Sequence, residues 1–200
     1  MVQLHFLVKS TKGVTSNKFL IKDLTGTSGR LDIIFRCLLA AFSFGSRNIF
    51  FHAVLNGPPN PPKALTFNGN RVGELPIDEI GMAHLFQTLL DPTKPLQKEG
   101  ITLVHRSFLD LASELAQEGP VFLLKENFPP FKESLVDLQK EKHAIHSIIF
   151  ILSDHIDLEP QEEEFLINKL QATRVNLGSR SYLASHSIIF LLMKLGKLKF

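Results

Sequence analysis

The feature that most constrains the fold is an alternation of short strand-like runs with helix-like runs, clearest in the second half of the chain. Strands are predicted at 101–105, 121–124, 147–152 and 174–177, and helices at 108–117, 131–140, 160–170 and 182–195. This alternation is typical of α/β folds, in which crossover connections join parallel strands. The sequence therefore predicts a single α/β domain over residues 1–200, with a largely parallel sheet flanked by helices.

The first half of the chain extends the same pattern. It adds strands at 3–9, 48–55 and 63–67 and helices at 30–44 and 78–90. The 48–55 run is almost continuously apolar, as in a central strand covered on both faces. Four prolines in 56–62 exclude that segment from a ladder, so it is predicted to be a rigid turn. In the 78–90 helix we expect Ile80, Leu85, Phe86 and Leu89 to point inward.

Composition excludes several classes of protein. The longest apolar stretches, 37–42 and 188–193, are far shorter than the roughly 20 residues that a membrane span needs. The start of the chain has neither a basic flank nor a small-residue cleavage site, so it is read as a strand rather than a signal peptide. One cysteine, Cys37, excludes internal disulfides and multi-cysteine zinc sites. These features predict a cytoplasmic, metal-independent protein.

Charge is unevenly distributed. Residues 1–50 contain seven Lys and Arg but two Asp, and no acid follows Glu164. Basic ends suit a polyanionic partner, but a solvated surface without a partner explains the charges equally well.

Common catalytic signatures are missing. The chain has no phosphate-loop, dinucleotide-binding, nucleophile-elbow or zinc-protease motif. Nucleotide hydrolysis, standard nicotinamide binding and α/β-hydrolase chemistry are therefore disfavoured.

The segment 26–32 opens a predicted helix and allows two interpretations. Its backbone could hold a phosphate, with Arg30 and Arg36 close by. Alternatively, Ser28 or Asp32 caps the helix. Cys37, on the apolar side of this helix, is interpreted as a core residue.

Parallel sheets bind ligands beyond the carboxyl ends of their strands, which predicts a site built from 125–128, 153–157 and 177–181. Ser153 to Ile156 is either a ligand-facing loop or a capping turn, and His155 there could be a ligand or a base. The acidic run 162–164 is interpreted as serving a helix dipole. His143 and His146 lack a third metal ligand at a recognisable spacing.

The last helix is apolar around most of its circumference, which indicates burial on more than one side. A second subunit is the expected cover. The residues concerned are Leu183, Ala184, Ile188, Ile189, Phe190, Leu191, Leu192 and Leu195.

Four stretches together resemble the archaeal-type tRNA pseudouridine-54 N1-methyltransferase family. They are Lys22–Asp32 with Arg36 and Cys37, Ala53–Pro62, Phe150–Ile156, and Arg174–Leu177. The resemblance runs over nearly the whole chain. It implies a SPOUT-type fold with a C-terminal trefoil knot, a homodimer, and S-adenosyl-L-methionine bound in the knot loops.

Carried over by position, the resemblance implies a cofactor site with members from four segments. They are Leu124, Ser153, Leu177, Gly178, Ser179, Arg180, Ser181, Tyr182 and Ser187. The family pattern has Gly at the position of Ser153 and Cys at that of Ser187, which suggests a divergent branch with a different RNA target as one alternative.

The resemblance thus predicts methyl transfer to N1 of pseudouridine, most simply in a tRNA T-loop. Lys12, Arg30 and Arg36 would grip phosphates. Asp32 would orient or deprotonate the target base, although a capping role for Asp32 remains open. The rival hypothesis is a knotted RNA-binding protein that does not turn over a methyl donor.

Overall fold

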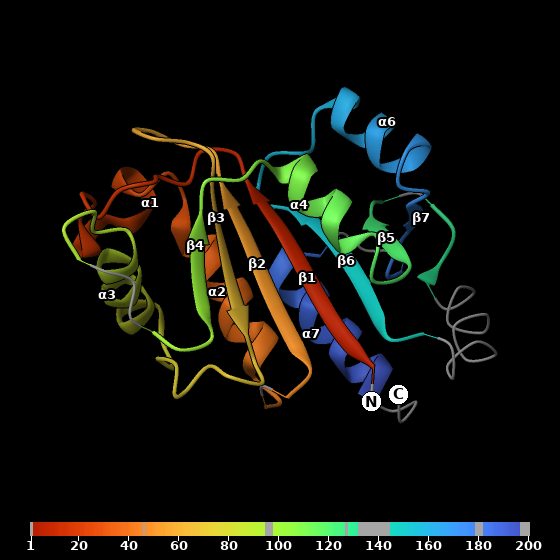
Figure 1. Ribbon diagram of the computed structural model, residues 1–200, viewed down its shortest axis with the longest axis horizontal. Coiled ribbons are helices and arrows are strands. Elements are labelled where there is room, and N and C mark those ends of the chain that lie inside the picture. The colour runs from red at the N-terminus through yellow and green to blue at the C-terminus, as the bar shows by residue number, and fades with distance from the viewer. Residues whose placement is uncertain are drawn as a thin grey trace.

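The computed structural model describes residues 2–45, 47–94, 98–126, 128–131, 145–178 and 182–196. Within these ranges a seven-stranded sheet has the order β4-β3-β2-β1-β6-β5-β7 (Figure 1). The strands are β1 (Gln3–Ser10), β2 (Ile49–Leu55), β3 (Lys63–Asn68), β4 (Ile101–Val104), β5 (Val121–Leu124), β6 (Ser147–Ser153) and β7 (Thr173–Val175).

The sheet is parallel except at one edge. Strand β1 pairs in parallel with β2 and β6, and β5 pairs in parallel with β6 and β7. Strands β3 and β4 continue the sheet antiparallel, because the short 56–62 connection turns the chain straight back from β2. The predicted largely parallel α/β sheet is confirmed.

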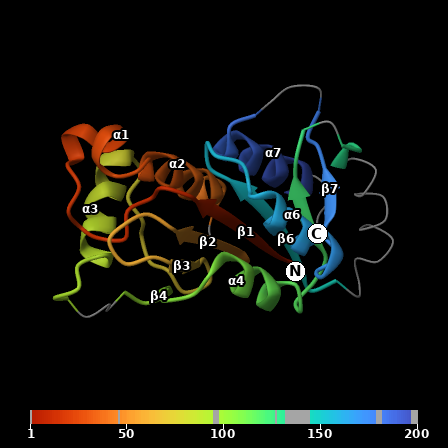
Figure 2. The ribbon, with the colours of Figure 1, turned by 90° about the horizontal axis from the view of Figure 1, so that it is seen from above.

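Helices cover both faces of the sheet (Figure 2). Helices α2 (Leu31–Phe42), α3 (Glu79–Leu89) and α7 (Ala184–Gly196) lie on one side, and α4 (Phe108–Leu115) and α6 (Pro160–Asn168) on the other. Two short helical turns, η1 (Ile21–Asp23) and α1 (Leu24–Thr27), precede α2 and were not predicted.

The core follows from alternation along the central strand. Phe6 and Val8 pack under α2 and α7, whereas Leu7 between them packs on the opposite side with α4. All three are fully buried. Strand β1 is therefore an axis with an apolar layer on each side, as expected for a doubly covered parallel sheet.

A few predictions need correction. Ile80 is exposed, because at the first turn of α3 the inward positions belong to Met82 and Ala83, which are buried along with Leu85, Phe86 and Leu89. The last strand begins earlier than predicted and ends at Val175. The helix predicted at 131–140 lies outside the described residues, apart from its first position. None of the helices described is long and apolar enough to cross a membrane.

Candidate functional site

A pocket of about 750 Å³ lies at the carboxyl ends of β5, β6 and β7. Its walls come from the segments that follow these strands, from the start of α7 and from α2. The volume is in the range of small-molecule and cofactor sites. This is the edge at which the sequence predicted a ligand site.

The residues predicted to bind the cofactor meet at this pocket as far as the structure describes them. The lining includes Leu124, Ser153, Leu177, Gly178, Tyr182 and Ser187. The other three, Ser179, Arg180 and Ser181, lie outside the described residues. All four predicted segments thus contribute to one cavity.

The loop after β6 both lines the pocket and forms a turn. The Asp154 carboxylate accepts hydrogen bonds from the Ile156 N–H at 2.8 Å, from the Thr11 N–H at 3.0 Å and from Ser10 Oγ at 3.2 Å. Asp154 thereby fastens this loop to the end of β1. Beside it, His155 lines the pocket, with Nδ1 3.6 Å from Asp154 Oδ1.

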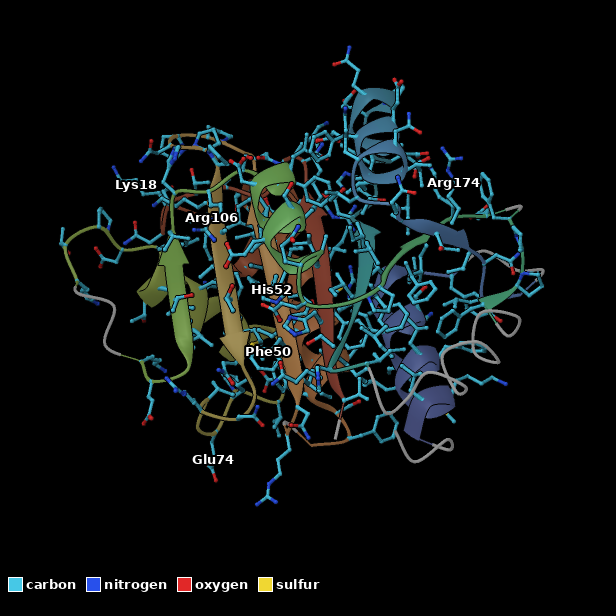
Figure 3. The ribbon with its side chains drawn as sticks, turned by 45° about the vertical axis from the view of Figure 1, so that its right-hand side comes forward. Lys18, Phe50, His52, Glu74, Arg106 and Arg174 are labelled. Carbon is cyan, nitrogen blue, oxygen red and sulfur yellow. The ribbon has the colours of Figure 1, made fainter. Side chains whose placement is uncertain are left out.

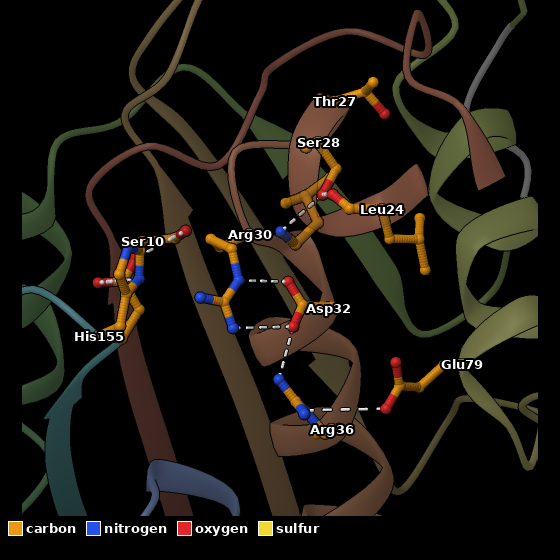
Figure 4. A network of polar contacts seen from close by, with 12 residues as sticks. Ser10, Leu24, Thr27, Ser28, Arg30, Asp32, Arg36, Glu79 and His155 are labelled. Carbon is orange, nitrogen blue, oxygen red and sulfur yellow. Dashed lines mark hydrogen bonds and ion pairs between the residues drawn. The ribbon is translucent and has the colours of Figure 1, made fainter. Parts of the chain in front are cut away.

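Arg30 and Arg36 line the α2 side of the pocket and share the buried Asp32 behind them (Figure 4). Arg36 Nε also lies 3.8 Å from Glu79 Oε1. Asp32 accepts from Arg30 Nε at 2.9 Å, from Arg30 Nη2 at 3.2 Å and from Arg36 Nη2 at 2.5 Å. Asp32 is only 3% exposed, whereas both arginines reach solvent. The hydrogen bond to Asp32 raises the pKa of the Arg30 guanidinium above its ordinary value. Asp32 therefore holds both guanidinium groups in place at the pocket wall.

The backbone holds Arg30 in an unusual conformation. Its φ of 71° is left-handed, directly after Gly29 at 63°. Such a conformation is rare for a residue with a side chain and recurs at functional sites. Ser28 Oγ, not Asp32, accepts the Leu31 N–H at 3.0 Å at the start of α2. Asp32 lies in the first turn of α2, where a carboxylate suits the helix dipole, but both its oxygens bind arginine and the backbone hydrogen bond at this helix start is made by Ser28.

The acidic run of α6 does more than serve the helix dipole. Glu162 pairs with Lys9 at 2.6 Å, and Glu163 with Lys125 at 2.5 Å. Burial disfavours the charged form of Lys125, but its contacts with Glu163 and Asp157 outweigh that effect and raise its pKa. The structural interpretation of this run is confirmed, because Glu162 and Glu163 lie in the first turn of α6 and their two ion pairs tie α6 to the ends of β1 and β5.

The remaining candidates lie elsewhere. Cys37 is buried, and burial raises the pKa of its thiol to about 12, as expected for a core residue. His143 lies outside the described residues, and those that are described contain no cluster of three metal ligands.

Sequence reasoning missed Asn176, which lies on the pocket wall. Its amide donates to the Phe128 carbonyl and its Oδ1 accepts the Gly178 N–H at 3.0 Å. One side chain thus connects the segments after β5 and β7. An Asn two residues before a Gly is a weak signal for such a loop contact.

Fold and site together define a class: an α/β protein with a pocket at the carboxyl ends of its parallel strands and an arginine pair on one wall. The fold matches that of Archaeoglobus fulgidus Nep1, whose crystal structure is bound to S-adenosylhomocysteine, with a TM-score of 0.67 and 13% identity over 100% of this chain and 99% of that chain. The predicted SPOUT-type fold class is thereby confirmed, while the knot itself stays a prediction.

The chain belongs to the family described as "Putative SAM-dependent RNA methyltransferase", whose sequence model matches residues 4–200. It is similar to the tRNA (pseudouridine(54)-N(1))-methyltransferase of Methanococcus maripaludis, with 35% identity over 98% of this chain and 99% of that protein. The protein of the same name from Pyrococcus abyssi is 31% identical over 96% of this chain and 97% of its own length. The resemblance stated from sequence motifs is confirmed.

Proposed function

We propose that this protein transfers a methyl group from S-adenosyl-L-methionine to N1 of a pseudouridine in structured RNA, with the tRNA T-loop as the preferred target. The observation that carries the proposal is the pocket at the strand ends, walled on the α2 side by Arg30 and Arg36. The names of its relatives supply the choice of tRNA and of nucleotide. Such a substrate places the protein in the cytoplasm.

The residues of the pocket fit the proposed cofactor. Leu124, Leu152 and Leu177 offer an apolar surface for a planar base, beside polar backbone at the strand ends. Glu126 and Asp157 add carboxylates that suit a positively charged group. When bound, S-adenosyl-L-methionine supplies an electrophilic methyl group on a sulfonium. Leu124, Ser153, the 177–182 loop and Ser187 are the proposed binding residues.

On the RNA side, the two arginines and Lys12 are proposed to bind phosphates. Arg30 is the best-placed of these because Asp32 fixes its guanidinium with two hydrogen bonds at the pocket wall. Asp32 then acts by orienting the arginines, and through them the substrate. Holding the acceptor nitrogen in line with the methyl group is the main contribution expected from such a site.

A homodimer is proposed because apolar side chains stay uncovered on Leu183 and on α7, which begins at the next residue. Its buried side packs on the sheet and on α2, but Leu183 is 61% and Met193 50% exposed, and the partly exposed Phe190 lies between them at helical spacing. A second copy of the chain would cover this stripe.

Transfer of labelled methyl groups to RNA tests the proposed function. The substrates are two T-loop hairpins, identical except for pseudouridine or uridine at the target position, followed by nucleoside analysis. N1-methylpseudouridine formed only in the first hairpin supports the proposal. Binding of RNA and cofactor without transfer would instead support the rival RNA-binding function, and transfer to another nucleotide would identify a different RNA target.

A further inference from the structure

Methylation of N1 releases a proton, and Asp32 is poorly placed to take it. Both oxygens of Asp32 already accept guanidinium hydrogen bonds, from Arg30 at 2.9 and 3.2 Å and from Arg36 at 2.5 Å. Its side chain is 5% exposed. A proton acceptor must come within hydrogen-bond reach of the substrate, directly or through one water. Another group of the same pocket must therefore fill this role.

His155 meets the requirements that Asp32 does not. Its side chain lines the pocket and is 34% exposed, so a bound base can reach it. In Figure 4, Arg30 lies between Asp32 on one side and Ser10 and His155 on the other. Among the described residues that line the pocket, His155 is the only one with an imidazole, the side chain that ordinarily changes protonation between pH 5 and 8.

The Asp154 carboxylate lies where it can orient the imidazole of His155. The Asp154 side chain is fully buried, and its Oδ1 lies 3.6 Å from His155 Nδ1. Hydrogen bonds from Ser10, Thr11 and Ile156 fix the carboxylate in place. A carboxylate at Nδ1 favours the tautomer with Nδ1 protonated, which leaves Nε2 as the acceptor, and it stabilises the imidazolium that forms. Contacts of this kind are commonly longer before substrate binds.

We propose that His155 is the proton acceptor of the methyl transfer and that Asp154 is its positioning residue. This inference rests on the proposed function. A bond forms between N1 and the methyl carbon, and the bond between that carbon and the sulfonium sulfur breaks with its electron pair left on sulfur. The N1 proton passes to Nε2 of His155, and solvent removes it after product release.

The surrounding charges are mixed. The charged and titratable groups that share the pocket with His155 are Arg30, Arg36, Lys125, Glu126, Asp154, Asp157 and Tyr182. Asp157 is largely exposed and pairs with Lys125 at 3.4 Å, so Asp154 is the carboxylate that acts on His155 most directly.

The test is the single-turnover rate of methyl transfer to the pseudouridine hairpin, measured from pH 5 to 9 for the wild-type protein and for His155→Gln. We expect a wild-type rate that rises with pH through an inflection between pH 5 and 8. His155→Gln should lower the rate about 100-fold or more and abolish the inflection. Affinities for the hairpin and for S-adenosyl-L-methionine should change less than twofold.

Two further variants sharpen the result. Asp154→Asn should lower the rate while leaving both affinities within about twofold, because His155 loses the carboxylate beside its Nδ1. In a His155→Gln background the same change should lower the rate no further. His84→Gln, which removes an exposed histidine from α3, should leave rate and inflection unchanged. A His155→Gln protein with the wild-type rate, or one that is slower but keeps the inflection, would overturn the role of His155 while leaving the methyltransferase function intact. If the wild-type protein transfers no methyl group, the proposed function itself fails.

Discussion

His5 and His52 form a buried pair whose protonation should control stability in mild acid. They lie on the α4 side of the sheet, where Figure 3 labels His52. His5 Nδ1 is 3.1 Å from His52 Nε2, and His52 Nδ1 is 2.9 Å from Thr66 Oγ1. Each of these hydrogen bonds needs one donor and one acceptor. Neutral imidazole rings meet this requirement, because each has one N–H group and one nitrogen that accepts. Burial lowers the pKa of His5 to about 4, and burial together with the charge of His5 lowers that of His52 to about 3.

The direction of the effect follows from proton binding. In the unfolded chain both rings take up a proton below about pH 6.5, whereas in the native protein neither does so until about pH 4. The unfolded state then binds more protons, so stability falls as the pH falls through this window. At pH 5 the loss is roughly 2 kcal/mol for each ring, at about 1.36 kcal/mol per pKa unit. Glu118, 3.4 Å from His5 Nε2, offsets little of this because it is nearly half exposed.

The measurement is urea unfolding of the wild-type protein and of His52→Gln at pH 7 and pH 5. Gln keeps hydrogen-bonding groups near His5 and Thr66 but does not titrate. The difference in unfolding free energy between the two pH values should shrink by roughly 2 kcal/mol in the variant. Carboxylates contribute equally to both proteins and cancel. His84→Gln, at an exposed site, should behave as wild type, and equal acid sensitivity in His52→Gln and wild type would refute the argument.

The remaining predictions concern the proposed function. Gly178→Val should weaken S-adenosyl-L-methionine binding about tenfold or more in calorimetry, because Gly178 has a φ of 142°, which a residue with a side chain rarely adopts, so the pocket loop must shift. The rest of the fold should stay intact, because a Cβ there meets nothing nearer than Tyr182 Oη at 3.9 Å. Arg30→Ala should weaken RNA binding and reduce its salt dependence by one phosphate contact, a slope change of about 0.9. Asp32→Asn should preserve RNA and cofactor affinity within about threefold but lower the single-turnover rate about tenfold or more, since its role is to orient the arginines; a wild-type rate would refute it. Light scattering should give twice the 22.5 kDa chain mass, and Leu183→Asp should give a monomer; a wild-type monomer at micromolar concentration would contradict the dimer.

The sequence predicted β2 and β6 well because these two strands are buried on both faces of the sheet. All residues of the 147–152 run are buried, so this strand could be predicted without knowing how it pairs with its neighbours. The position of the pocket was predicted from the general preference of parallel sheets to bind ligands beyond the carboxyl ends of their strands, not from any single residue. The contacts of Lys9 with Glu162 and of His5 with His52 could not be predicted, because they join positions 153 and 47 residues apart and depend on how strands and helices pack. The prediction for Ile80 was wrong because helical spacing identifies the apolar side of a helix but does not show which turns of that side contact the core.

The sequence motifs on which the family resemblance rests hold neighbouring loops together, in addition to supplying residues of the pocket. A Cβ on Gly29 or on Gly57 would collide with the Lys12 carbonyl, so the loops before α2 and after β2 both pack directly on the loop after β1. Hydrogen bonds from Val14 to the Ser28 carbonyl and from Gly57 to the Gly13 carbonyl join the same three loops.

Asp154 then fastens the loop after β6 to this assembly through Thr11. The positions of Arg30 and His155 are in this way set by one packed group of loops, not by the two side chains themselves. A glycine in such a motif can therefore be required even though no ligand touches it. For this reason Gly57→Ala, at a residue that does not line the pocket, should slow single-turnover methyl transfer by displacing Arg30, and it should change the affinity for S-adenosyl-L-methionine least.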